Sequence, residues 1–133
     1  YASVYGPGLN QKTALPIFID KAIKNEDITI YQEGKRSQDY VYVEDTAFAN
    51  LLAAEKNITG AFNIASGEVT TMKNLANTII SVFNSRSRVH FDKSLLEDFS
   101  IGIDIKKAIN ELGYFPSYSL REGLEKYKDS LSL

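Results

Sequence analysis

Residues 26–45, EDITIYQEGKRSQDYVYVED, decide the fold of this chain. Two short runs within this stretch, 28–31 (ITIY) and 40–43 (YVYV), are rich in the β-branched and aromatic residues that favour strands. Between them lies a polar segment in which Gly34 tolerates the positive φ angle of a turn. We therefore predict two strands joined like a hairpin, with Lys35 and Arg36 at the tip, as in many binding loops held by a rigid scaffold.

The composition excludes several classes of function. The chain has 133 residues, of which 44% are hydrophobic and 24% charged, so one globular domain over 1–133 is expected. Its formal net charge of -2 disfavours a nucleic-acid partner. The absence of cysteine and the single histidine argue against a metal centre. No apolar run approaches the roughly 18–20 residues of a membrane span, and no signal peptide is recognisable, so a cytoplasmic protein with no membrane partner is expected.

The rest of the chain alternates between strand-like and helix-like segments, which indicates the α/β class. Hydrophobic spacing predicts helices over 13–24, 44–56 and 120–131, the last opened by a capping box of Ser119 and Glu122. A further helix is expected after Thr70 or Thr71, and another over 105–112 with Asp104 as its N-cap. Strands are predicted at 1–4, 61–65 and 88–91, and 93–100 is interpreted as a loop.

Three motifs occur together, and together they resemble a known family. They are Ser3–Gly8 (SVYGPG), 34–45 (GKRSQDYVYVED) and 62–67 (FNIASG), followed by a tail at 104–116 (DIKKAINELGYFP). This order and spacing resemble the C-terminal half of the NAD-dependent epimerase/dehydratase family, the extended short-chain dehydrogenases/reductases that act on nucleotide sugars. The resemblance implies a Rossmann-like α/β fold. It also implies that 1–133 is the substrate-binding fragment and that the NAD-binding part is absent upstream.

The same resemblance implies an activity for the parent protein. It would be an NAD-dependent nucleotide-sugar epimerase or dehydratase, most commonly a 4-epimerase, and it would be a homodimer. The family's catalytic Ser/Thr and Tyr-x-x-x-Lys residues lie upstream of the VYGPG motif, and no glycine-rich dinucleotide fingerprint occurs here, so no catalytic residue is expected in this chain. Alternatives are a 4,6-dehydratase, a non-catalytic sugar- or nucleotide-binding module, and a self-standing interaction domain.

The resemblance also assigns candidate binding residues. Tyr1 matches a position beside the nicotinamide of NAD, and Thr13 and Ala14 begin the helix over the substrate. The strand Thr29–Ile30–Tyr31 matches one whose backbone contacts the nucleotide base.

The chain departs from the family at three substrate-contact positions. Ser3 replaces an Asn, Gln38 replaces a phosphate-binding Arg, and no Arg occurs at 95–98, where the family has a second one. Either the substrate is not a nucleotide diphosphate sugar or another cation compensates. Arg36 is the best substitute because residues two apart on a strand share a face. The other candidates are Lys35, Arg86, Arg88 and Lys93.

Four further polar residues have simpler explanations. Asp39, Asp45 and Asn63 are interpreted as caps and loop hydrogen-bonding residues. His90, between Val89 and Phe91, is interpreted as an ordinary strand histidine.

Overall fold

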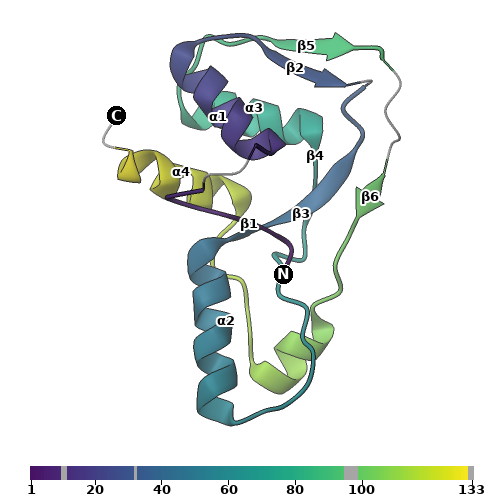
Figure 1. The fold of residues 1–133 in the computed structure, drawn as a ribbon, viewed down its shortest axis with the longest axis vertical. Coiled ribbons are helices and arrows are strands. Elements are labelled where there is room, and N and C mark those ends of the chain that lie inside the picture. Colours follow the sequence, from purple (N-terminus) through teal and green to yellow (C-terminus); the bar gives the residue numbers. More distant parts are fainter. Residues whose placement is uncertain (10–11, 32, 95–98, 132–133) are drawn as a thin grey trace.

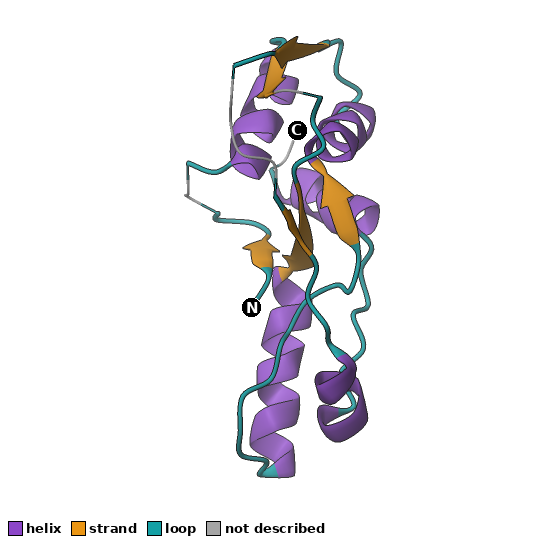
Figure 2. Ribbon diagram, turned by 90° about the vertical axis from the view of Figure 1, so that its right-hand side faces the viewer, coloured by secondary structure: helices purple, strands orange, loops and turns teal. Residues whose placement is uncertain are grey.

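The computed structural model describes residues 1–9, 12–31, 33–94 and 99–131. Three helices and a small sheet form one end of the molecule: α1 (Ala14–Lys24), α3 (Met72–Val82) and α4 (Leu120–Ser130) (Figure 1). At the other end, α2 (Val43–Lys56) lies beside the short π-helical segment η1 (Ala108–Leu112), as Figure 2 also shows. The mixture of short strands and helices confirms the predicted α/β class.

Strand β3 (Ser37–Tyr42) lies at the centre of the main sheet. Its C-terminal half pairs in parallel with β1 (Ser3–Tyr5). Its N-terminal half pairs with β4 (Val69–Thr71), antiparallel, and with β6 (Ser100–Ile101), parallel. The last four residues of β3 are buried. Through its pairings, this strand joins segments that are far apart in the sequence.

The hairpin prediction for 28–43 is wrong. Strand β2 (Ile28–Tyr31) pairs in parallel with β5 (Val89–Asp92), and no ladder joins β2 to β3 within the described ranges. Gly34 does have a positive φ of 68°, but it redirects the chain between two sheets. The physical reason is that Ile28 and Ile30 are buried among helices α1 and α3, whereas β3 is buried in the main sheet.

Other boundaries differ from the predictions. Segment 61–65 is not a strand, although Ile64 and Ala65 are buried. Ala2 N–H donates a hydrogen bond of 2.9 Å to the Ile64 carbonyl, but no strand ladder forms there among the described residues. The predicted 93–100 loop ends in β6, and 95–98 lie outside the described residues. The predicted helix over 105–112 widens into a π-helix at Ala108. Strand β4 was not predicted.

The helical periodicity of the sequence correctly identifies the larger core. Helix α1 buries Leu15, Phe18, Ile19 and Ala22, and α3 buries Leu75, Ala76, Ile79 and Val82. The capping box of α4 is present, and Thr71 Oγ1 accepts a hydrogen bond from Asn74 N–H at 3.1 Å. Leu131, the last residue of the predicted helix over 120–131, follows the end of α4 and is exposed. A smaller core lies between α2 and η1 around Ala49, Leu112 and Tyr114.

Candidate functional site

A cleft of about 810 Å³ opens beside β1, the start of α1, β2 and β3. Eight of the nine candidate binding residues line it, although they come from four separate elements and connections. They are Ser3, Thr13, Ala14, Thr29, Ile30, Tyr31, Arg36 and Gln38. Their binding roles stay predictions, but the tertiary structure brings them to one surface.

One face of β3 supplies a row of polar side chains to this cleft. Arg36, Gln38 and Tyr40 all line it, because alternate residues of a strand point to the same side. The intervening side chains of Ser37 and Asp39 are buried. The strand therefore directs Gln38 and Tyr40 toward the cleft and Ser37 and Asp39 away from it.

The cleft carries positive charge. Lys12, Lys21 and Arg36 line it, and none of the lining residues that the structure describes is an Asp or Glu. Lys21 Nζ also donates a hydrogen bond to the backbone oxygen of Asp27 at 3.0 Å. A cleft lined by one sign of charge attracts ligands of the opposite sign, so an anionic ligand suits it.

Tyr40 is a cleft residue that sequence reasoning missed. Its side chain is only 5% exposed, and its hydroxyl has no hydrogen-bond partner of good geometry among the described residues. Burial raises the pKa of Tyr40 to about 12, although the nearby Gln38 amide and the charge of Arg36 act in the opposite direction. The hydroxyl is thus protonated at neutral pH and retains an unused capacity to donate a hydrogen bond among the described residues. Its spacing from Gln38 was the signal that could have identified it.

Tyr1 is the candidate residue that the structure places elsewhere. It does not line the cleft, its side chain is 67% exposed, and its hydroxyl donates a hydrogen bond to Asn50 Oδ1 at 2.7 Å. Its assignment to NAD stays a prediction.

Most of the cations considered as substitutes for the missing Arg do not line the cleft. Lys35 forms an ion pair with Glu33, and neither Arg86 nor Lys93 lines the cleft. Arg88 lies at the start of β5, where its side chain reaches Asp27 at 3.3 Å. Arg36 is therefore the one of these candidates that lines the cleft.

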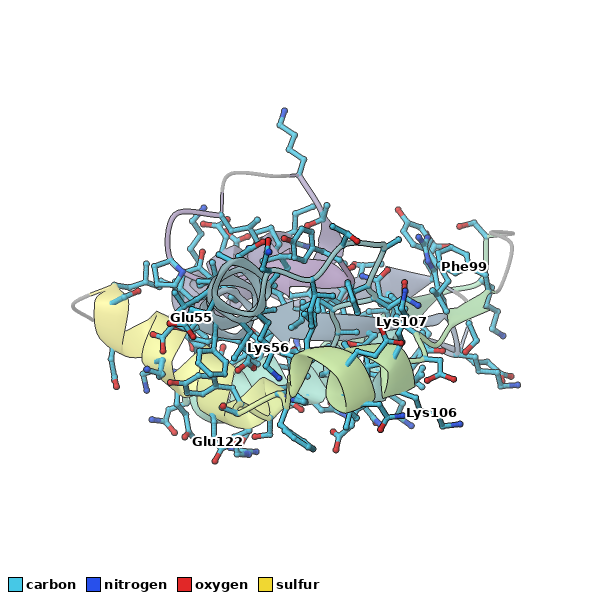
Figure 3. All side chains as sticks on the ribbon, turned by 90° about the horizontal axis from the view of Figure 1, so that it is seen from below. Glu55, Lys56, Phe99, Lys106, Lys107 and Glu122 are labelled. Carbon is cyan, nitrogen blue, oxygen red and sulfur yellow. The ribbon has the colours of Figure 1, made fainter. Side chains whose placement is uncertain are left out.

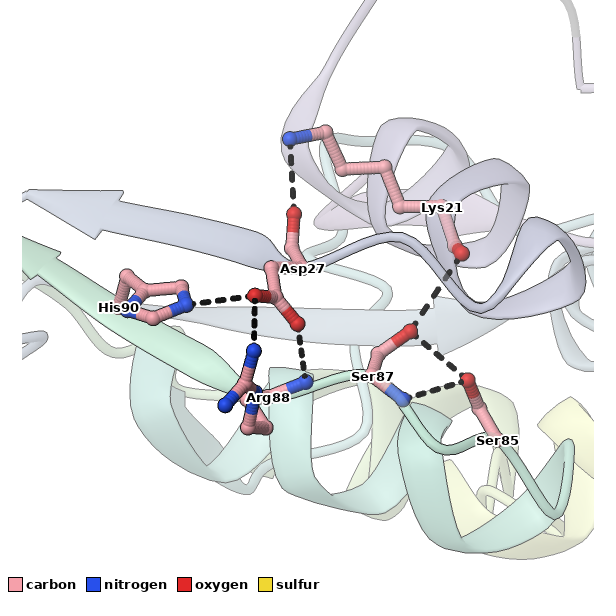
Figure 4. Close-up of polar contacts among 6 residues, drawn as sticks. All are labelled: Lys21, Asp27, Ser85, Ser87, Arg88 and His90. Atoms are coloured by element: carbon pink, nitrogen blue, oxygen red, sulfur yellow. Dashed lines mark hydrogen bonds and ion pairs between the residues drawn. The ribbon is translucent and has the colours of Figure 1, made fainter.

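Asp27 joins β2 to β5 at the edge of the smaller sheet (Figure 4). Its carboxylate accepts hydrogen bonds from the Arg88 backbone N–H at 2.9 Å and lies 2.7 Å from His90 Nε2. These contacts, with the Arg88 backbone N–H first, lower the pKa of Asp27 to about 2. The structure confirms His90 as a strand residue, in β5.

The structural interpretation of the acidic and amide residues is confirmed. The Asp39 carboxylate accepts hydrogen bonds of 2.8 Å from Ser66 N–H, Ser66 Oγ and Gly67 N–H. Asp45 accepts from the backbone N–H groups of Ser117 and Tyr118. Asn63 donates to the backbone oxygen of Asp104. These bonds hold loops in place around the sheet.

A tyrosine and a lysine do meet in space, although no Tyr-x-x-x-Lys motif is present. Lys126 Nζ lies 2.9 Å from Tyr118 OH and 2.8 Å from Glu44 Oε2. The hydrogen bonds that Lys126 donates to Glu44 and Tyr118 raise the pKa of Lys126, which keeps it charged. This triad ties α4 to the start of α2 and does not line the cleft, so it is a structural contact.

Comparison with known proteins agrees with this geometry. Residues 1–65 match the model of the NAD dependent epimerase/dehydratase family. The chain is 37% identical over 131 residues to a candidate UDP-glucose 4-epimerase of Methanocaldococcus jannaschii, a match that covers 95% of this chain. A crystal structure of the UDP-glucose 4-epimerase of Thermotoga maritima with UDP-glucose superposes on 99% of the chain, with a TM-score of 0.88 and 32% identity. The chain is thus similar to members of the NAD-dependent epimerase/dehydratase family over nearly its whole length.

Other members of the family are also similar. A dTDP-4-dehydro-6-deoxyglucose reductase of Escherichia coli is 31% identical over 132 residues. The UDP-glucuronic acid 4-epimerase of Bacillus cereus, solved with UDP-glucuronic acid and NAD, is 29% identical with a TM-score of 0.85. The chain spans 42% of the length of the Methanocaldococcus and Escherichia relatives and 44% of the Thermotoga structure. The match therefore concerns one part of an epimerase/dehydratase.

The described residues contain neither a membrane-spanning helix nor a cluster of metal ligands. No helix among these residues combines the length and hydropathy needed to cross a membrane. The same residues contain no group of three or more His, Cys, Asp or Glu side chains arranged to hold a metal ion.

Proposed function

We propose that this chain is the substrate-binding portion of an NAD-dependent nucleotide-sugar epimerase or dehydratase, most simply a 4-epimerase. The observation that carries the proposal is the cleft, where seven family-matched positions and the proposed substitute Arg36 meet two lysines and no described carboxylate. A nucleotide diphosphate sugar has an anionic centre between two polar groups, which fits such a cleft.

The chain's own residues would bind and orient the substrate. Strand β2 would contact the nucleotide base along Thr29–Tyr31, and Arg36 would contact the diphosphate. Ser3 and the Tyr40 hydroxyl are placed to hydrogen-bond the ligand, because both line the same cleft. Such positioning matters because holding reacting groups in a productive geometry removes much of the entropic cost of reaction.

The hydride chemistry would be supplied by NAD, which takes a hydride from a sugar carbon and returns it. Tyr1 is the proposed contact of this chain with NAD. The general base and most of the cofactor site would lie in the NAD-binding part that the family resemblance puts upstream, so 1–133 would be a single substrate-binding region without catalytic residues. We propose a cytoplasmic homodimer for the parent protein.

Exposed apolar side chains of α2 support the proposal of a second, NAD-binding part. Three large apolar side chains of this helix are exposed: Val43 at 37%, Phe48 at 46% and Leu51 at 52%. A group of exposed large apolar residues often marks a surface that packs against another element. The NAD-binding domain is the proposed cover for these residues.

The proposal is tested by calorimetric titration of UDP-glucose and UDP into the full-length protein at low salt. We expect micromolar binding, about -8 kcal/mol. Arg36→Ala should weaken this binding by roughly 10- to 100-fold, because the cleft then loses its guanidinium but keeps Lys12 and Lys21. Arg86→Ala is the matched control, since that exposed arginine does not line the cleft and its removal should leave the affinity unchanged.

The departures at Ser3 and Gln38 favour a second candidate, a family member that binds a sugar without a nucleotide diphosphate. In that case Gln38→Arg would create UDP binding that the unaltered protein lacks. A 4,6-dehydratase would be recognised by release of water from a dTDP- or UDP-sugar. A self-standing interaction domain would bind neither NAD nor sugar nucleotides.

A further inference from the structure

Arg36 contacts an aromatic ring that the sequence patterns did not single out. The guanidinium carbon of Arg36 lies 3.8 Å from the centroid of the Phe99 ring. The backbone fixes this contact, because β3 and β6 run in parallel with Ser37 opposite Ser100. The Ser37 N–H also donates to the Phe99 carbonyl at 3.0 Å. Arg36 and Phe99 therefore precede paired positions on neighbouring strands.

The stacking leaves the hydrogen-bonding groups of Arg36 available. A cation above a ring interacts with the π face, whereas the N–H groups of a guanidinium point outward in its own plane. Arg36 lines the cleft, whereas Phe99 is not among the described residues that line it. Among the described residues, no ion pair or hydrogen bond occupies the Arg36 side chain. Within this part of the chain, the guanidinium N–H groups can therefore bind an oxyanion.

Phe99 comes from a part of the chain far from β3 in sequence. It lies at one flank of the molecule, away from Glu122 of α4 (Figure 3). Its strand β6 pairs with the residues Ser37 and Gln38, where the family's phosphate-binding Arg is replaced by Gln. The ring is therefore positioned beside the site of that replacement.

We propose that Phe99 is a positioning residue that orients the Arg36 guanidinium toward the phosphate groups of the ligand. The stacked pair would provide the fixed positive charge that Gln38 does not carry. This inference rests on the proposed function, because it requires an anionic ligand in the cleft. It adds that the affinity for that anion depends on a residue that does not touch it.

The test is a double-mutant cycle in the full-length protein, with UDP and uridine as calorimetric probes. Phe99→Leu removes the π face and should weaken UDP binding about 3- to 10-fold, as expected for a cation–π contact. Binding of uridine, which lacks the phosphates, should not change. In an Arg36→Ala background, Phe99→Leu should have no further effect, and Phe99→Tyr should bind UDP like the unaltered protein.

Phe91→Leu is the matched control. Phe91 likewise lies near a cation, with Lys73 Nζ 6.0 Å from its ring, but it does not line the cleft, and its cation is not Arg36. This change should leave UDP affinity unaltered.

Three results would overturn the inference while leaving the proposed function in place. One is unchanged UDP binding by Phe99→Leu when Arg36→Ala weakens it. The second is an equal loss for UDP and uridine, and the third is an equal loss in the Arg36→Ala background. Either of the last two would show a purely structural role. If the unaltered protein bound no UDP at all, the proposed function would fail first and the inference with it.

Discussion

Replacing Tyr40 with Phe should stabilise the free protein and weaken its ligand binding. The Tyr40 side chain is 5% exposed, and its hydroxyl lacks a hydrogen-bond partner of good geometry within the described residues. Leaving a buried polar group unsatisfied costs about 1–3 kcal/mol. Removing only the oxygen retains the ring packing, so we expect the free energy of unfolding to rise by about 1–2 kcal/mol.

The same change should reduce affinity for the ligand. If the ligand supplies the missing hydrogen bond, its loss should cost about 0.5–1.5 kcal/mol, which corresponds to roughly 2- to 12-fold in dissociation constant. Chemical denaturation of the full-length protein measures the first effect and titration with UDP-glucose measures the second. The two effects have opposite signs, which a general loss of structure cannot produce.

Tyr114→Phe is the control for this experiment. Tyr114 is fully buried, but its hydroxyl donates a hydrogen bond of 2.9 Å to the Ala65 backbone oxygen. Its removal should therefore lower the free energy of unfolding by about 1 kcal/mol and leave binding unchanged. If Tyr40→Phe lowered stability as Tyr114→Phe does, the Tyr40 hydroxyl would be satisfied in solution and the argument would be refuted.

Two further predictions concern stability. Gly123→Ala should destabilise the protein, because an added Cβ would clash with the Tyr5 hydroxyl and lie 2.8 Å from Cζ of that ring. Overpacking costs about 1–3 kcal/mol, against a gain of roughly 1 kcal/mol in helix propensity, so an increase in the urea midpoint would contradict the packing argument. Asp27 has a pKa lowered from 3.8 to about 2, so its stabilising contribution is complete above about pH 4 and is lost as the pH falls toward 2. Acid titration of stability should show a shallower decline in this window for Asp27→Asn than for the unaltered protein.

Sequence reasoning identified much of the candidate site because motif positions are local. Gln38, Arg36 and the start of the helix at Thr13 follow from short patterns. Tyr40 lies two residues beyond Gln38, so strand alternation could have indicated it. Phe99 could not be identified in this way, because its position depends on the pairing of β6 with β3, which joins residues about 60 positions apart.

The amino-acid sequence by itself determined the resemblance to the epimerase/dehydratase family, the α/β class and most helix positions. These depend on periodicity, caps and motif spacing, which are properties of neighbouring residues. Only the tertiary structure decided the strand partners. Strands β2 and β3 are close in sequence, yet Ile28 and Ile30 bury themselves against α1 and α3 and pair with β5, while β3 pairs with β1, β4 and β6. Strand pairing follows where apolar side chains find burial, and that depends on the whole chain.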